Sequence, residues 1–248
     1  MNFVYILLLI IGILIILILI FSLPRKKNLR KPSFEGFDSP EVAAAFEKMT
    51  NFLPFKILRR RILSELKKYN LKGKLVDLGC GSGNLIIQIA NNFPNLDLKG
   101  VDISSDVLEL AKKRVLENNL NKKIEFKIGS AADFPFSDNS IDFIISTLSL
   151  HHWQEPTKAL SEIFRVLKQN GIFLIFDFRR DARKFFYGLL KFVTKVVVPK
   201  VLKEINEPIG SLQAGYTPTE IRRIISQTSF DNIEIDLYLA WMFIKMKK

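Results

Sequence analysis

The sequence predicts an α/β fold with a doubly wound, mostly parallel, seven-stranded sheet and flanking helices. Three observations predict it. Five apolar segments alternate with amphipathic segments of helix length, two more apolar segments follow near the carboxyl end, and a glycine-rich turn follows the first of the seven. Strands that alternate with helices pair in parallel, because each helix returns the chain to the same end of the sheet. At 248 residues the chain can hold one such domain with additional segments.

The first segment, residues 3–23, is expected to be a transmembrane helix. No charged or strongly polar side chain occurs between Phe3 and Phe21, and at about 1.5 Å per residue this length matches the hydrocarbon core of a bilayer. A cleaved signal peptide needs a positive amino-terminal region and a shorter apolar core, but Met1 and Asn2 carry no side-chain charge. A retained anchor is therefore favoured over a signal peptide, and both are favoured over a buried core helix.

Basic residues follow the anchor directly, with no acid before Glu35. Because Lys and Arg beside a span are retained on the cytoplasmic side, we expect a single-pass membrane protein whose main body faces the cytoplasm. Residues 24–40 contain three prolines and one glycine and are interpreted as a basic linker. Its five basic residues account for part of the net charge of +12 and are Arg25, Lys26, Lys27, Arg30 and Lys31.

The main body, residues 41–248, is expected to begin with two helices. Ser39 followed by Pro40 is a helix-start signal for the first, and the second runs from about Pro54 to Tyr69. Strands are then expected over 74–79, 96–103, 124–130, 141–147 and 171–178, and helices around 84–92, over 104–119 and over 156–168. Residues 232–239 and 241–248 predict two more strands, a hairpin that joins the same sheet.

Residues 179–213 interrupt this alternation. The stretch is too long and too apolar for a simple connection, so we expect it to form helices. Lysines separate its bulky apolar residues, which is typical of a lid or of an insertion that contacts a membrane. Helices packed on the domain with their lysines in water are the alternative. The lysines are Lys184, Lys191, Lys195, Lys200 and Lys203.

The stretch LVDLGCGSGNL, residues 75–85, predicts the floor of a site for a nucleotide-like cofactor. A strand that ends at Asp77 is followed by glycines and by a helix from about Asn84. Glycine permits a tight turn and removes side chains that would keep a ligand from the backbone. The spacing G-x-G-x-G lacks the third glycine of the dinucleotide fingerprint, and no Gly-Lys-Ser/Thr follows, so NAD and a Walker phosphate loop are disfavoured. Asp102 ends the second strand, where a carboxylate can accept both hydroxyls of a ribose.

Four motifs together resemble class I S-adenosylmethionine-dependent methyltransferases of the small-molecule type, which have a Rossmann-like fold. They are VDLGCGSGNL, LKGVDIS, GSAADFPFSDNSIDFIISTLSLHHW and VLKQNGIFLIFD. The resemblance covers residues 73–178. Residues 216–235, YTPTEIRRIISQTSFDNIEI, are similar to the last helix and strand of the family. The anchor and residues 183–213 lie outside the resemblance.

The resemblance implies S-adenosyl-L-methionine as cofactor. In the family pattern Asp77 and the glycines would surround the methionine part, Asp102 would bind the ribose and Ile103 would pack on the adenine. Ser130 stands where the family often has an acid that contacts the adenine amino group, and a hydroxyl accepts more weakly than a carboxylate. The backbone amide of Ala131 could still serve the adenine. The ten residues assigned to the cofactor are Asp77, Gly79, Cys80, Gly81, Gly83, Asp102, Ile103, Ser130, Ala131 and Ser146.

Methyl transfer from a sulfonium needs alignment of the acceptor and exclusion of water more than it needs a particular catalytic side chain. His151 and His152, the only histidines, follow the fourth strand, where substrates of the family approach, and are candidates for a general base. Bonding to local backbone groups is the alternative for both. Cys80, the only cysteine, is interpreted as a packing residue. Because the chain has no second thiol, neither a disulfide nor a metal site is expected.

The sequence therefore predicts a membrane-anchored methyltransferase that acts on an apolar or membrane-associated small molecule, such as a lipid, a quinone or an isoprenoid-like molecule. The anchor and the apolar, lysine-bearing stretch motivate this substrate class. Nucleic acid is disfavoured because no Asn-Pro-Pro-aromatic stretch follows the fourth strand. The alternative is a catalytically silent cofactor-binding module that acts as a membrane interaction partner.

Overall fold

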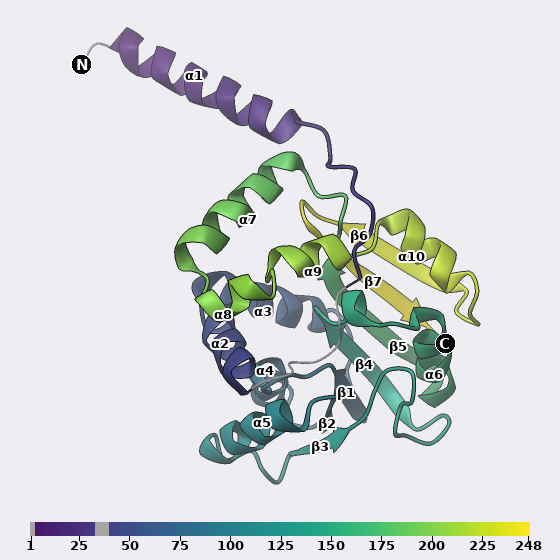
Figure 1. Ribbon diagram of the computed structural model, residues 1–248. Helices are drawn as coiled ribbons and strands as arrows, with labels where there is room; N and C mark the ends of the chain where they lie inside the picture. Colours follow the sequence, from purple (N-terminus) through teal and green to yellow (C-terminus); the bar gives the residue numbers. More distant parts are fainter. Residues whose placement is uncertain (1–2, 33–39) are drawn as a thin grey trace.

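The computed structural model describes residues 3–32 and 40–248. Ser39 and most of the second half of the expected linker lie outside the described residues. The domain is built on one seven-stranded sheet of order β3-β2-β1-β4-β5-β7-β6 (Figure 1). β7 is antiparallel to both of its neighbours, and the other pairs are parallel. This confirms the predicted sheet and hairpin. The strands are β1 Lys74–Leu78, β2 Asp97–Asp102, β3 Ile124–Ile128, β4 Ile141–Thr147, β5 Leu167–Phe178, β6 Asn232–Leu237 and β7 Trp241–Lys247.

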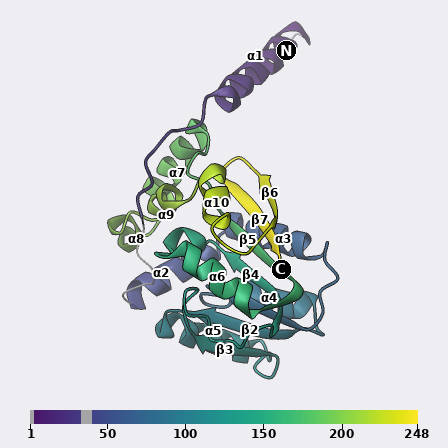
Figure 2. The ribbon, with the colours of Figure 1, turned by 90° about the vertical axis from the view of Figure 1, so that its right-hand side faces the viewer.

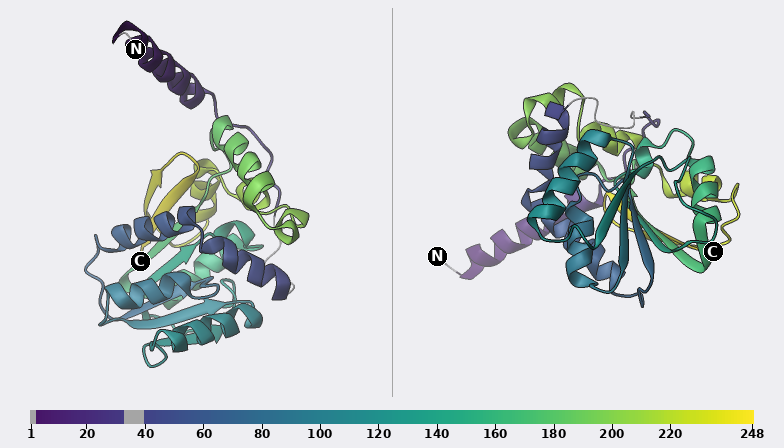
Figure 3. Two further views of the ribbon diagram at one scale, coloured as in Figure 1. Left: turned by 90° about the vertical axis from the view of Figure 1, so that its left-hand side faces the viewer. Right: turned by 90° about the horizontal axis from the view of Figure 1, so that it is seen from below.

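Helices cover both faces of the sheet (Figure 3). One face packs on α3, Leu53–Leu66, on α4, Asn84–Asn92, and on α5, Ser105–Glu117. The other face packs on α6, Pro156–Val166, and α10, Pro218–Ile225. Burial of two apolar faces explains why the central strands have nearly continuous apolar sequences.

The boundary between α6 and β5 differs from the prediction. The helix expected to reach residue 168 ends at Val166, and the strand begins at Leu167 instead of Gly171. Leu167 pairs with Ile141, and the register then shifts so that Phe143 pairs with Ile172. Residues 167–170 thus belong to an irregular start of β5, and such irregularities leave no periodic signal in the sequence.

The amino-terminal helix α1, Phe3–Ser22, projects from the domain (Figure 1). Among the described residues it is the one helix whose length and apolar composition suit a bilayer, with a mean hydropathy of 3.6 over Phe3–Phe21 and no part of that stretch buried. α2, Pro40–Thr50, follows the undescribed residues and packs beside α3.

Residues 23–32, here called the connecting segment, lie along the domain (Figure 2). The Lys26 amide donates to the carbonyl of Ala182 at 3.1 Å, and the Arg180 guanidinium donates to the carbonyl of Asn28 at 2.9 Å. Arg183 donates to the carbonyl of Leu23 at 3.1 Å. The segment is therefore bonded to the residues that follow β5, and it does not stand free.

Three helices occupy most of residues 179–213, and the last ends one residue beyond that range. They are α7 Lys184–Val197, α8 Lys200–Glu204 and α9 Ile209–Ala214. α8 packs on α2 through a small apolar cluster that includes Met49, Val198 and Leu202. α9 contacts the short 3-10 helix η1, Leu150–His152, which follows β4. These helices therefore surround the carboxyl end of the sheet on the side of β4 and β5.

Candidate active site

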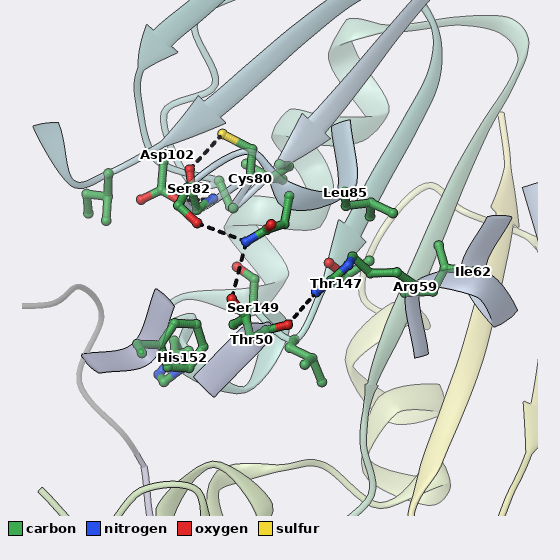
Figure 4. A pocket seen from close by; sticks show the side chains of 18 of the residues that line it. Thr50, Arg59, Ile62, Cys80, Ser82, Leu85, Asp102, Thr147, Ser149 and His152 are labelled. Atoms are coloured by element: carbon green, nitrogen blue, oxygen red, sulfur yellow. Dashed lines mark hydrogen bonds between the residues drawn. The ribbon is translucent and has the colours of Figure 1, made fainter. Parts of the chain in front are cut away.

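A cavity of about 1230 Å³, its open mouth included, lies at the carboxyl ends of β1, β2 and β4. This edge is where open parallel sheets bind ligands. Figure 4 shows Asp102 and Ser82 on one side of the cavity and Arg59 with Ile62 on the other. Of the predicted site residues, those that line it are Gly79, Cys80, Gly81, Asp102, Ile103, Ser130, Ala131 and His152.

The glycine-rich turn exposes main chain to this cavity. The amides of Gly79 and Cys80 both donate to the carbonyl of Val101, at 2.8 and 3.0 Å, and this fixes the turn against β2. Gly81 has a φ of 54°, and no atom lies within 4 Å of the point where its Cβ would stand. A Cβ at Gly79 would instead lie 2.6 Å from the Ser149 hydroxyl. Glycine at residue 79 thus permits close packing, whereas glycine at residue 81 keeps the floor of the cavity bare.

Asp102 supports the turn and faces the cavity. One carboxylate oxygen accepts from the Gly81 amide at 2.8 Å, and the other accepts from the Ser104 amide at 3.0 Å. A carboxylate has about four acceptor positions, so capacity remains for two hydroxyl donors. Burial raises the pKa of Asp102, and the backbone donors of Ser104, Gly81 and Ile103 offset part of this rise.

Asp77 does not line the cavity but lies fully buried in β1, two residues before Gly79. Neither of its carboxylate oxygens has a hydrogen-bond partner within the described residues. Burial, and secondarily the charge of Asp102, raises its pKa to about 7. A buried carboxylate without a partner is costly, and a cationic group brought near the turn would stabilise its charged form. The ammonium of the cofactor's methionine part is such a group.

Four more of the residues predicted to bind the cofactor line the cavity, namely Cys80, Ile103, Ser130 and Ala131. Ile103 is 47% exposed and presents an apolar side chain at the mouth. The Ser130 hydroxyl accepts from the Asp133 amide at 3.1 Å, and Ala131 is buried beside it. Burial raises the pKa of the Cys80 thiol, so this side chain stays protonated and acts as a packing group.

Two further predicted cofactor residues are not at the cavity. Gly83 precedes α4 with a φ of 79°, and a Cβ there would lie 3.3 Å from Ala111, so its place is in the packing of α4 against α5. Ser146 is fully buried within β4 and does not line the cavity. Sequence spacing does not reveal this, because successive side chains of a strand point to opposite faces.

The two histidines have different surroundings. His152 lines the cavity. His151 is 1% exposed, and its Nδ1 lies 2.6 Å from a carboxylate oxygen of Asp177, whose other oxygen accepts from the His151 amide at 3.0 Å. Asp177 therefore holds both the ring and the backbone of His151, and of the two histidines only His152 lines the cavity.

Residues of α2 and α3 complete the cavity, and the sequence did not identify them as part of the site. Phe46 of α2 and three residues of α3 form an apolar wall together with Trp153. The three residues of α3 are Phe55, Leu58 and Ile62. Arg59 also lines the cavity and is only 8% exposed. Its guanidinium donates to the Thr50 carbonyl at 2.8 Å, while its Nε has no partner among the described residues. In the sequence Arg59 begins a run of three arginines that is typical of a solvated helix face.

α2 is joined to the glycine-rich turn by polar contacts. Arg114 of α5 donates to the Ser82 carbonyl at 2.9 Å and forms an ion pair with Glu47 of α2. The Asn84 side chain donates to the Thr50 hydroxyl at 3.2 Å. The apolar wall and the cofactor floor are therefore held against each other. Within residues 3–32 and 40–248 no group of three or more His, Cys, Asp or Glu could hold a metal ion.

Comparison with known proteins agrees with this arrangement. A family model described as a methyltransferase domain matches residues 71–212. The ubiquinone/menaquinone biosynthesis C-methyltransferase of Rickettsia felis is 26% identical over 205 residues, which are 77% of this chain and 82% of that protein. The protein of the same name from Rickettsia prowazekii is 30% identical over 175 residues, 66% of this chain and 71% of the relative.

Solved structures show the same fold. A putative S-adenosyl-L-methionine-dependent methyltransferase from Methanococcus maripaludis has a TM-score of 0.68 at 21% identity, covering 90% of this chain and 97% of that one. Phosphoethanolamine N-methyltransferase 2 of Haemonchus contortus, in complex with S-adenosyl-L-methionine, has a TM-score of 0.66 at 19% identity, covering 85% and 57%. The match of the family model over more than half of the chain and the glycine-rich site at the sheet edge lead to one conclusion: the chain belongs to the class I S-adenosylmethionine-dependent methyltransferases.

Proposed function

We propose that the protein is a membrane-anchored methyltransferase that transfers a methyl group from S-adenosyl-L-methionine to an apolar small molecule dissolved in the membrane. The observation that carries the proposal is the two-sided cavity. On its cofactor side, the main chain is bare at Gly81 and the Asp102 side chain presents a carboxylate. The other side is the apolar wall of α2, α3 and Trp153.

In this proposal the cofactor side binds by main chain and by three charged groups. Asp102 accepts the ribose hydroxyls, the buried Asp77 stabilises the ammonium, and the Arg59 guanidinium attracts the carboxylate of the methionine part. Ile103 packs on the adenine. The bound cofactor supplies a methyl group already activated by its positive sulfur, so the protein's task is to align the acceptor and exclude water. His152, which lines the cavity, takes a proton from an acceptor that must lose one.

An apolar acceptor fits the remaining part of the cavity. Among the described lining residues, Arg59 and Asp102 are the ones that carry a full charge, and the cofactor uses both of them in this proposal. A charged acceptor would therefore lose its hydration without gaining a partner. The names of the relatives point the same way, because they describe C-methyltransferases of quinone biosynthesis. We propose a quinone-type or related apolar ring compound as acceptor.

The membrane location rests on α1 and on the basic residues after it. α1 has the length and composition of a bilayer span, and the cluster that begins at Arg25 favours a cytoplasmic domain. An enzyme held at the membrane meets an acceptor that is concentrated in the bilayer, which explains why an anchor would accompany an apolar pocket.

Methyl transfer can be tested with the full chain reconstituted in lipid vesicles. The reaction would contain methyl-labelled S-adenosyl-L-methionine and one of two acceptors. The first is a prenylated hydroquinone that lacks the ring methyl group, and the second is phosphoethanolamine, which is soluble in water. We expect label in the organic-soluble product only. A variant that places a side chain on the cofactor floor, Gly81→Asn, serves as the inactive control. Saturable cofactor binding without any labelled product or release of S-adenosylhomocysteine would instead identify a silent binding module.

A further inference from the structure

α7 carries an exposed apolar stripe along the side that faces away from the domain. Leu189, Phe192 and Val196 recur at helical spacing and are 44%, 65% and 64% exposed. Val193 and Val197 lie beside them and are exposed as well. On the opposite side of the helix, Tyr187 and Thr194 are buried against the domain. A continuous apolar stripe of this kind in water marks a contact surface.

Three lysines lie along one edge of this stripe. Lys184, Lys191 and Lys195 recur at spacings of seven and four residues, which places them in one row on the helix, and all three are exposed. No acidic residue occurs within α7. An apolar face bordered by a row of lysines is typical of helices that lie in the plane of a membrane surface.

α7 begins beside the foot of α1 (Figures 1 and 2). The rings of Phe21 in α1 and Phe185 in α7 have centroids 5.5 Å apart. Arg183, directly before α7, bonds the Leu23 carbonyl, and Arg25 forms an ion pair with Asp181 at 3.4 Å. The first turn of α7 is therefore held at the depth at which α1 leaves the bilayer.

We propose that α7 is a second membrane contact, whose apolar stripe inserts into the acyl boundary of the bilayer while its lysine row binds anionic lipid headgroups. The inference rests on the proposed membrane span of α1. A helix of 14 residues is about 21 Å long, so this contact extends well beyond the footprint of a single span. It fixes the orientation of the domain as well as its attachment.

A bilayer suits this face better than a second copy of the chain does. In an antiparallel dimer across α7 the two lysine rows would approach each other without an acidic partner on the helix, and like charges repel. Lipid phosphates provide the opposite charge, so each lysine near an anionic surface is attracted to it. Continuity with α1 also places lipid, rather than water, next to Phe185.

The contact has a consequence for the acceptor. α7 continues into Val198 and α8, which pack on α2 through Met49 and Leu202. Phe46 on the same helix α2 lines the active cavity. An inserted α7 therefore sets the apolar wall of the cavity next to the membrane surface, so that an apolar acceptor enters from the bilayer.

The proposal can be tested by the depth of fluorescent labels in the full chain. Three variants, each with one cysteine in addition to Cys80, would be labelled with a nitrobenzoxadiazole dye and reconstituted in vesicles with anionic lipid. They are Leu14→Cys in α1, Phe192→Cys in α7 and Leu116→Cys in α5. All three side chains are exposed, and α5 lies at the end of the domain remote from α1 (Figure 1). The unsubstituted chain, whose only cysteine is the buried Cys80, sets the background. Lipids with a spin label on the acyl chain then serve as quenchers.

We expect these lipids to reduce emission at residues 14 and 192 about twofold and to leave residue 116 unchanged. Quenching at residue 14 without quenching at residue 192 would overturn the inference and leave the anchor standing. The absence of quenching at both would overturn the anchor and the inference together. A label at residue 192 that is shielded from aqueous iodide but not quenched by lipid would show that protein covers this face, and would also overturn the inference.

Discussion

Asp77 is expected to reduce the stability of the cofactor-free domain at neutral pH, and Asp77→Asn should remove this effect. Its carboxyl is buried without a partner among the described residues, and its pKa is raised from 3.8 to about 7. An acid whose pKa is higher in the folded chain binds more protons when folded than when unfolded. The free energy of unfolding therefore falls as the pH rises through the window from about 4 to about 7.

The magnitude follows from the two pKa values. One pKa unit corresponds to about 1.4 kcal/mol, so the rise from 3.8 to about 7 costs about 4 kcal/mol above pH 7. Near pH 5 only part of the window has been crossed, and the cost is about 2 kcal/mol. Asn has almost the same shape and does not ionise. The free energy of unfolding of Asp77→Asn should therefore exceed that of the parent chain by about 2.5 kcal/mol more at pH 8 than at pH 5.

Urea unfolding in detergent, without cofactor, measures this difference through the fluorescence of Trp153 and Trp241. Asp142→Asn is the matched control. Burial acts to raise the pKa of Asp142, but hydrogen bonds from Lys168 and from the Lys74 amide outweigh it and lower the pKa. The Asp142 carboxylate contributes its full stabilisation above about pH 4. Asp142→Asn should therefore lower the free energy of unfolding by the same amount at pH 5 and at pH 8. An equal effect of Asp77→Asn at the two pH values would refute the reasoning.

Three further predictions concern the cavity and α7. Asparagine tolerates the positive φ of residue 81 better than alanine does, so the Gly81→Asn variant should be more stable than Gly81→Ala. Asparagine also places a larger group on the cofactor floor, so Gly81→Asn should bind S-adenosylhomocysteine more weakly, as measured by calorimetry. Asp177→Asn should lower the free energy of unfolding by about 2 kcal/mol, because it weakens the hydrogen bonds that hold His151. His152→Gln should instead lower turnover with no change in melting temperature. The opposite pattern would reverse the roles of the two histidines. Phe192→Ser should raise the KM for an acceptor dispersed in vesicles and leave the KM for a short-chain soluble analogue unchanged. Equal changes in the two KM values would count against α7 as a membrane contact.

The order of the elements was predictable because each has a local cause. Apolar periodicity determines the strands and helices, and Thr217 with Glu220 forms the capping box that starts α10. The cofactor floor was predictable for the same reason, since Asp102 must lie beside Gly81 when β1 and β2 are parallel neighbours. The face on which a strand residue lies was harder to predict, which is why Ser146 was assigned to a cavity that it does not reach.

The apolar wall was not predictable, because it depends on how α2 and α3 pack over the edge of the sheet. Arg59 stands in a basic run that looks like a solvated surface, yet the fold buries it at the cavity. Contacts between distant parts of a chain leave no periodic signal, and Arg59 becomes a site residue only through such contacts.

The connecting segment, residues 23–32, has a role that only the fold reveals. Its prolines and basic residues are typical of a linker, but the Arg30 guanidinium donates to the carbonyls of Ala214 at 2.8 Å and of His151 at 3.0 Å. It also lies 4.1 Å from the centre of the Tyr216 ring. Each charge-assisted bond to a carbonyl stabilises the contact by about 1.5 to 3 kcal/mol. Because the His151 carbonyl belongs to the turn that carries His152 into the cavity, the residues that join α1 to the domain also hold this side of the cavity in place.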